Sequence, residues 1–230
     1  MEFFTVAMYV TAGLEIIAMI LSFAIPACRK NHLPAKMVCS ALFILTAVFA
    51  AISYGNMTQY TTLMLGALIF AAAGDFFLDW KDGKTFYGGV VCFSICHILY
   101  IYTFLFNRTP SLVGYVKQVL IGLVILGIVS AAHIALNKIK FIGKDKALIP
   151  YCLILVASFM IAVTRGAAAI AEGNTAYGIC LAGAGTLFLA SDGCLAALMF
   201  GKPILPHTDQ MVAYTYFPAQ TLFAISILFQ

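Results

Sequence analysis

Residues 66–80 read GALIFAAAGDFFLDW, and residues 183–200 read GAGTLFLASDGCLAALMF. Each stretch is an apolar run with one aspartate well inside it, Asp75 in the first and Asp192 in the second. At the same spacing in both, a Gly-Ala pair precedes the aspartate and a leucine follows it. Two acids in matching apolar surroundings predict one shared site.

A carboxylate within a bilayer is expensive, at about 3 kcal/mol on the milder insertion scales. An acid placed there therefore serves chemistry, the passage of ions or protons, or a paired structural bond. The glycines and alanines around both aspartates also suit close helix packing, which is the structural alternative for these stretches.

The composition excludes most soluble classes. The chain of 230 residues is 63% hydrophobic and only 10% charged, which is typical of an all-α polytopic membrane protein. The apolar runs are long and do not alternate, so the pattern does not favour a membrane β-barrel. The net charge of +4 is spread through short connections, and it predicts no nucleic-acid partner.

Eight stretches are long enough to cross a hydrocarbon core of about 30 Å as helices. They cover residues 3–25, 36–54, 60–79, 85–106, 112–136, 148–171, 175–200 and 210–229. The breaks between them carry proline, glycine, asparagine or charge. The first stretch is too long for a signal-peptide core and predicts a true span. Residues 1–230 thus form a single transmembrane domain.

Lysine and arginine predict the orientation, because they gather in cytoplasmic connections. Ten of them lie in alternate connections: Arg29, Lys30, Lys36, Lys81, Lys84, Lys138, Lys140, Lys144, Lys146 and Lys202. Only Arg108 and Lys117 lie on the opposite side. Both termini are therefore predicted on the non-cytoplasmic side, in a multi-pass protein of a bacterial inner membrane or an endomembrane.

The two aspartates lie in the third and seventh spans, which run in the same direction. This spacing is consistent with a parallel four-plus-four repeat. Both acids then fall in the cytoplasmic half of the bilayer, at matching depths. A shared site requires such a match.

Other polar side chains also lie inside predicted spans, and these are Glu15, His97, Tyr100, Arg165, Ser191, Tyr216 and Gln220. His97 and Tyr100 share a helix face, because they are one turn apart. Each of these residues has a structural alternative as a hydrogen-bonding link between helices. Arg165 has a further one, an ion pair with Glu15 or an aspartate. Asp79, at the edge of a connection, is interpreted as a solvated acid.

Familiar motifs for metal and cofactor sites are missing from the sequence. The four histidines form no HxxxH or HExxH pattern, and there is no GxSxG elbow or dinucleotide-binding glycine loop. We therefore expect no metal and no other cofactor. A mixed metal site of two aspartates and one histidine is the alternative.

Several pieces in order resemble the YhhN family of membrane proteins, the lysoplasmalogenases. They are Gly74-Asp75-x-x-Leu78, a glycine-rich run from Gly88 leading into His97-x-x-Tyr100, the Ser191-Asp192-x-x-Leu195 run, and Tyr216 to Gln220. These pieces extend from the third predicted span to the eighth. Their spacing is similar to the family's eight-helix pattern.

The resemblance implies an ether hydrolase that cleaves the vinyl-ether bond of a lysoplasmalogen. The products would be a fatty aldehyde and glycerophosphoethanolamine or glycerophosphocholine. Asp75 and Asp192 would be the catalytic pair, facing each other and holding one proton between them. The partners implied are a lysophospholipid substrate and membrane lipids, with no metal or cofactor required.

The remaining polar residues take supporting roles under this resemblance. His97, Tyr100, Ser191, Tyr216 and Gln220 would orient the acids or the attacking water. Lys36 or Arg165 would hold the lipid phosphate, and Glu15 would meet the ethanolamine.

Three other functions remain open from the sequence. Buried acids and parallel repeats also describe a proton-coupled transporter of small solutes or lipids. Such carriers often have helices broken near mid-span, whereas Pro218 is the one deep proline here. The others are an intramembrane hydrolase of another lipid ether, ester or amide, and a non-catalytic scaffold.

Overall fold

A computed structural model describes residues 2–25, 28, 32–79, 85–106, 112–140 and 148–230. Within these residues the chain is helical and contains no strand. The long helices are α1 (Glu2–Ala24), α3 (His32–Tyr54), α4 (Gln59–Asp79), α5 (Phe86–Phe106), α6 (Leu112–Leu136), α7 (Ile149–Ala171), α8 (Thr175–Phe200) and α9 (Thr208–Ser226). They coincide with the predicted stretches to within a few residues at each end.

The largest difference lies at the start of α3. The sequence predicts this helix from residue 36, after Pro34, but it begins at His32. Proline is tolerated in the first turn of a helix, where its missing N–H would have had no partner inside the helix. Pro34 therefore lies inside the helix and not in the break before it.

Six helices, α1, α3, α4, α5, α7 and α8, are long and apolar enough to cross a membrane. The protein is thus a multi-pass integral membrane protein. Helix α9 is more polar than these, and the side chains of residues 112–119 in α6 lie outside the described part. The predicted count of eight spans is confirmed for six helices and stays a prediction for α6 and α9.

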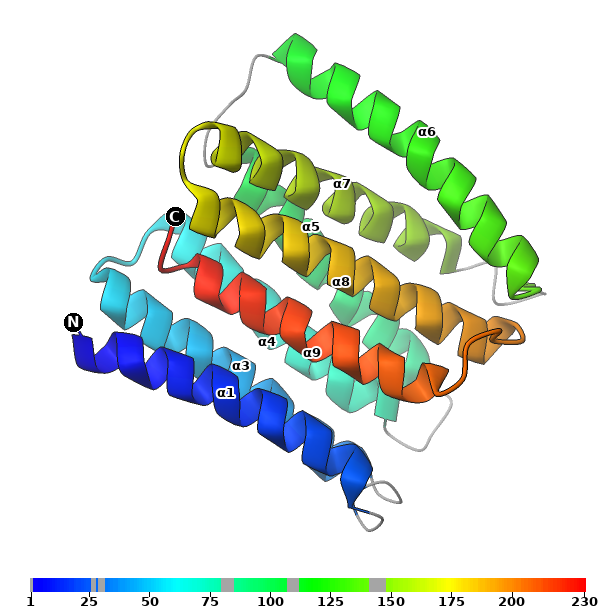
Figure 1. The fold of residues 1–230 in the computed structure, drawn as a ribbon, viewed down its shortest axis with the longest axis horizontal. Coiled ribbons are helices and arrows are strands. Elements are labelled where there is room, and N and C mark those ends of the chain that lie inside the picture. Colours follow the sequence, from blue (N-terminus) through cyan, green and yellow to red (C-terminus); the bar gives the residue numbers. More distant parts are fainter. Residues whose placement is uncertain (1, 26–27, 29–31, 80–84, 107–111, 141–147) are drawn as a thin grey trace.

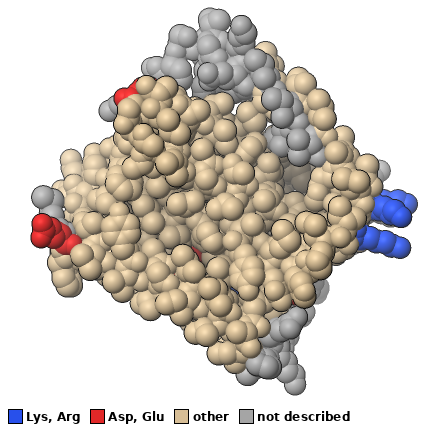
Figure 2. All heavy atoms as spheres, viewed as in Figure 1, with Lys and Arg blue, Asp and Glu red and all other residues tan. Residues whose placement is uncertain are grey.

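The helices run alternately up and down in one bundle, and both chain ends lie at the same end of it (Figure 1). Helices α8 and α9 lie against each other, as do α4 and α5, α7 and α8, and α1 and α3. Helix α6 lies at the margin of the bundle and contacts α7 (Figure 1). The described lysines gather at the end opposite the termini (Figure 2), where α6 and α8 finish.

The helix contacts agree with the order expected of a four-plus-four repeat. In that repeat α1, α3, α4 and α5 correspond to α6, α7, α8 and α9. The pairs α1–α3, α3–α4, α4–α5 and α5–α7 then correspond to α6–α7, α7–α8, α8–α9 and α9–α3, and all eight are in contact. This agreement supports the repeat, which stays a prediction.

Glycines set the closest helix approaches. A Cβ atom on Gly166 of α7 would come within 2.6 Å of the Gly178 carbonyl oxygen of α8, and one on Gly178 within 2.5 Å of the Gly166 carbonyl oxygen. A Cβ atom on Gly74 of α4 would lie 2.6 Å from the ring of Phe93 on α5. These contacts bring α7 against α8 and α5 against α4.

Candidate active site

A cavity of about 390 Å³ lies at the end of the bundle away from the termini. Its wall is mainly apolar and comes from α3, α4, α5, α7, α8 and α9, with Ser22 and Phe23 from α1. The acids, lysine and histidine on that wall are His32, Lys36, Asp75, Asp79, Asp192 and Asp209. A mostly apolar cavity of this size with a few convergent polar groups is the usual form of a small-molecule site.

Asp75 lies on the wall of this cavity and is only 1% exposed. Its Oδ2 accepts hydrogen bonds from Ser40 Oγ at 2.7 Å and from the Tyr216 hydroxyl at 2.8 Å. Lys36 Nζ lies 3.4 Å from Asp75 Oδ1. Helices α3, α4 and α9 converge on this carboxyl group, and two hydroxyl donors with one ammonium stabilise a carboxylate anion there.

Asp192 has a different environment, although it lies on the same cavity. It is half-buried on α8, and its Oδ2 accepts a hydrogen bond from the Tyr151 hydroxyl of α7. Within the described part of the chain, no lysine or arginine pairs with it. Asp192 is therefore the less charge-compensated of the two acids and the more open to a ligand.

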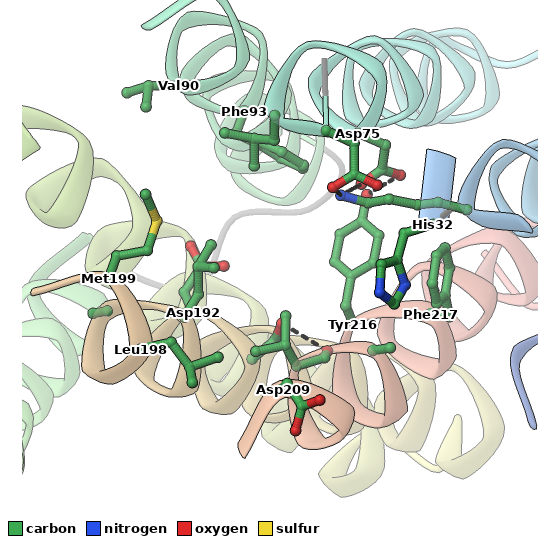
Figure 3. A pocket seen from close by; sticks show the side chains of 18 of the residues that line it. His32, Asp75, Val90, Phe93, Asp192, Leu198, Met199, Asp209, Tyr216 and Phe217 are labelled. Carbon is green, nitrogen blue, oxygen red and sulfur yellow. Dashed lines mark hydrogen bonds and ion pairs between the residues drawn. The ribbon is translucent and has the colours of Figure 1, made fainter. Parts of the chain in front are cut away.

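The two carboxyl groups lie on separate walls of the cavity (Figure 3). Each has its own phenol donor, and no hydrogen bond joins the two groups among the described contacts. The structure thus brings Asp75 and Asp192 to one cavity, and their sharing of one proton stays a prediction. Tyr151 on α7 donates its hydrogen bond to Asp192, and Tyr216 on α9 donates its own to Asp75.

Lys36 links Asp75 to a third acid. Its Nζ also lies 3.9 Å from Asp79 Oδ1, one turn further along α4. Asp79 is 29% exposed, and it lines the cavity instead of standing free in solvent. The interpretation of Asp79 as merely solvated is wrong, because α3 places the Lys36 ammonium between the two acids.

Tyr100 and Gln220 form a buried pair behind the cavity wall. The Tyr100 hydroxyl donates to Gln220 Oε1 at 2.6 Å, joining α5 to α9. His97 lies one turn from Tyr100, with its ring 4.5 Å from that of Phe188 and 6.0 Å from that of Tyr151. Its ring nitrogens have no hydrogen-bond partner among the described residues. These side chains support the wall and do not line the cavity.

Three further predicted site residues have partners or places other than those predicted, although Ser191 does line the cavity. Ser191 Oγ donates to the Val212 carbonyl oxygen at 3.0 Å, which joins α8 to α9 and not to an acid. Arg165 lies 3.9 Å from Glu172, toward the opposite end of α7, and not beside Glu15 or an aspartate. Glu15 is fully buried and has no hydrogen-bond partner among the described residues. Arg165 and Glu15 do not line the cavity, so the structure gives no support to head-group roles for them.

Metal-ligating side chains do not cluster in the described part of the chain. No three His, Cys, Asp or Glu residues there lie in an arrangement that would hold an ion. The alternative of two aspartates and one histidine therefore finds no such group in the described residues.

The family model for YhhN matches residues 31–227 of the chain. The chain belongs to the YhhN family. The match covers α3 to α9 with the whole cavity wall apart from Ser22 and Phe23, and it leaves out α1 with Glu15.

Several proteins similar to this YhhN-family chain are named lysoplasmalogenase. Lysoplasmalogenase TMEM86B of Homo sapiens is 30% identical over 171 residues, 74% of this chain and 65% of that protein. Lysoplasmalogenase TMEM86B of Sus scrofa is 28% identical over 203 residues, 88% of this chain and 79% of that protein. Lysoplasmalogenase TMEM86A of Homo sapiens is 26% identical, over 88% of this chain and 81% of that protein. No solved structure matches the chain.

Two partners of the acids in this YhhN-family site escaped the sequence analysis. Ser40 follows Lys36 by one helical turn, so the shared face was a usable signal. Tyr151 follows Pro150 at the start of a span, where a tyrosine normally indicates the membrane interface. Nothing local marked Tyr151 as the partner of Asp192, because that contact depends on how α7 packs against α8.

Proposed function

We propose that this YhhN-family protein is an ether hydrolase that cleaves the vinyl-ether bond of a lysoplasmalogen in the cavity between α4 and α8. The observation that carries the proposal is the pair of acids on one apolar cavity, each held by its own tyrosine. The names of the relatives support the same reaction.

The reaction needs an acid, a fixed anion and one water molecule. Protonation of the β-carbon of the vinyl ether gives an oxocarbenium ion. Water adds to that ion and loses a proton, and the hemiacetal collapses to a fatty aldehyde and the glycerol hydroxyl of glycerophosphoethanolamine or glycerophosphocholine. One water molecule is consumed, and the catalytic proton is returned to the enzyme.

The unequal surroundings divide these roles between the acids. Asp192, which lines the cavity and has no paired cation among the described residues, is the proton donor, and Tyr151 orients it. Asp75, held as an anion by Ser40, Tyr216 and Lys36, stabilises the oxocarbenium ion and accepts the proton of the attacking water. The cavity then resets when Asp75 loses this proton to solvent water and Asp192 gains one from solvent water.

The proposed lysoplasmalogen substrate has one orientation in the cavity. The hydrocarbon chain contacts the apolar wall, and the phosphate lies near Lys36, whose side chain is 22% exposed. This places the head group at the lysine-bearing end of the bundle, which the charge pattern assigns to the cytoplasm. The proposal also includes eight membrane spans. It further includes the four-plus-four repeat and the position of both termini on the non-cytoplasmic side.

The test is release of fatty aldehyde from lysoplasmenylethanolamine by the purified protein in detergent, with and without a chelator. Chelator-resistant release that is lost in Asp75→Asn and in Asp192→Asn supports the proposal. Glu2→Gln, at the exposed start of α1, is the control for loss of an acid. Equal release by both Asn variants and wild type would remove the acids from the mechanism.

A proton-coupled transporter remains the second candidate, and one observation favours it. Glu15 is a wholly buried carboxyl group without a hydrogen-bond partner in the described residues, on a helix that contributes little to the cavity. Folded protein that releases no aldehyde but acidifies or alkalinises the lumen of proteoliposomes would favour transport.

A further inference from the structure

The connections that follow α6 and α8 are bonded to each other, although their sequences lie some sixty residues apart. Lys202 N donates to the Asn137 carbonyl oxygen at 2.6 Å, and Lys140 N donates to the Phe200 carbonyl oxygen at 2.9 Å. The Asn137 side-chain oxygen accepts a third hydrogen bond, from Ile204 N at 3.1 Å. Asn137 is buried at the centre of this junction.

Glycine makes the contact possible. A Cβ atom on Gly201 would lie 2.5 Å from the Asn137 carbonyl oxygen and 3.0 Å from Ile139. His133 adds another link from α6, with Nε2 2.9 Å from the Gly193 carbonyl oxygen on α8. The ends of α6 and α8 are therefore held together by backbone and side-chain contacts, although α6 lies at the margin of the bundle.

Three exposed lysines meet at this junction. Lys138, Lys140 and Lys202 line one open hollow. Figure 2 shows lysine and arginine side chains in blue along one edge of the molecule. In the described part of the chain no aspartate or glutamate pairs with any of them. The backbone contacts thus hold three positive charges close to one another.

The rest of the hollow is apolar. Ile134, Ile139, Met199 and Phe200 line it together with the lysines, from α6 and α8. Helix ends are also where a bilayer has its head groups, because the apolar parts of α6 and α8 finish here. A soluble anion would contact the lysines but not the apolar side chains of the hollow, whereas a lipid would contact both.

We propose that this hollow is a binding site for an anionic membrane lipid, with its phosphate on Lys138, Lys140 and Lys202 and the upper part of its acyl chains on the apolar floor. Basic hollows between membrane helices on the cytoplasmic side commonly bind such head groups. The lipid braces α6 against α8. The site is separate from the cavity that holds Asp75 and Asp192, so it does not depend on the reaction proposed there.

The experiment measures lipid retention by native mass spectrometry on full-length protein in uncharged detergent, with added phosphatidylglycerol or phosphatidylcholine. Wild type retains phosphatidylglycerol at lower concentration than phosphatidylcholine. Each Lys→Gln substitution at 138, 140 and 202 weakens phosphatidylglycerol retention about fivefold, so the triple variant loses the preference. Lys81→Gln with Lys84→Gln, from the connection between α4 and α5, is the control for removing basic residues, and it keeps the preference.

Gly201→Val is the second variant, because it forces the two connections apart without removing a charge. It is expected to weaken phosphatidylglycerol retention while leaving that of phosphatidylcholine unchanged. Size-exclusion profiles that match wild type show that both variants are folded. Unchanged retention in the triple variant, or an equal loss in the control pair, would overturn the site. If millimolar inorganic phosphate displaced the bound lipid as effectively as added phosphatidylglycerol does, an anionic lipid would be overturned as the occupant of this hollow.

Discussion

Tyr216 on α9 donates a hydrogen bond to Asp75 on α4 over 2.8 Å. This contact joins one of the last residues of the chain to an acid in its first half, and it completes the carboxylate environment that Ser40 and Lys36 begin. The Tyr216 ring also packs edge-to-face with Phe93 and Phe188, which holds the ring in place.

Tyr216→Phe is expected to lower aldehyde release roughly ten- to hundredfold, because one hydrogen bond to a charged group is worth about 1.5–3 kcal/mol. The ring packing is retained, so the protein should stay folded, with a melting temperature lowered only by the loss of this one hydrogen bond. Tyr214→Phe is the matched control, since that side chain lies on the same helix and is 39% exposed. An unchanged rate in Tyr216→Phe would mean that Asp75 needs no support from α9.

Tyr151→Phe tests the proton donor separately. Tyr151 donates to Asp192, so its loss leaves that carboxyl group free to rotate away from the substrate. We expect kcat to fall roughly tenfold while KM stays nearly constant, because Tyr151 positions the acid and does not hold the lipid. Kinetics over a range of lysoplasmenylethanolamine concentrations make the distinction, with Tyr87→Phe, 40% exposed on α5, as control. A rise in KM alone would move Tyr151 to the lipid-binding wall.

Lys36→Gln should change both parameters. It removes the ammonium 3.4 Å from Asp75 and the positive charge proposed for the lipid phosphate. We expect a lower kcat and a higher KM, with partial rescue by Lys36→Arg, which keeps the charge. A Lys36→Arg variant as inactive as Lys36→Gln would show that the charge at this position is not what matters.

Gly166→Ala tests the packing that brings α7 to α8. The new methyl group would meet backbone atoms of Gly178 and Ala182 at 2.6 and 2.9 Å, and backbone yields less readily than a flexible side chain. We expect a loss of stability of about 1–3 kcal/mol, seen as a lower melting temperature in detergent. Gly13→Ala, where no atom lies within 4 Å, is the control and should be neutral or slightly stabilising. Equal melting temperatures for the two variants would contradict the close contact.

The helices could be predicted from the sequence because apolar length and the residues that break it are local properties. The stretch predicted at 175–200 is α8 itself, and that at 60–79 differs from α4 by one residue. The partners of the acids could not be predicted in the same way. Tyr151 and Tyr216 reach Asp192 and Asp75 from helices that become neighbours only when the bundle packs.

Helix packing, which the sequence does not reveal, also explains why the predicted roles of some residues found no support. Arg165 and Glu15 stood out because charge inside a span is costly, but cost alone does not say which cavity a side chain faces. Arg165 lies toward the far end of α7 beside Glu172, and Glu15 faces the interior of the bundle. Asp79 looked unremarkable at the end of a span, yet Lys36 draws it into the site.

The most direct test of the central claim is the mass of the aldehyde released from lysoplasmenylethanolamine in D₂O. Protonation of the vinyl-ether β-carbon through Asp192 predicts an aldehyde with one deuterium on the carbon next to the carbonyl group, and no aldehyde from Asp192→Asn. An aldehyde without deuterium, or deuterated aldehyde formed at the wild-type rate by folded Asp192→Asn, would contradict the account.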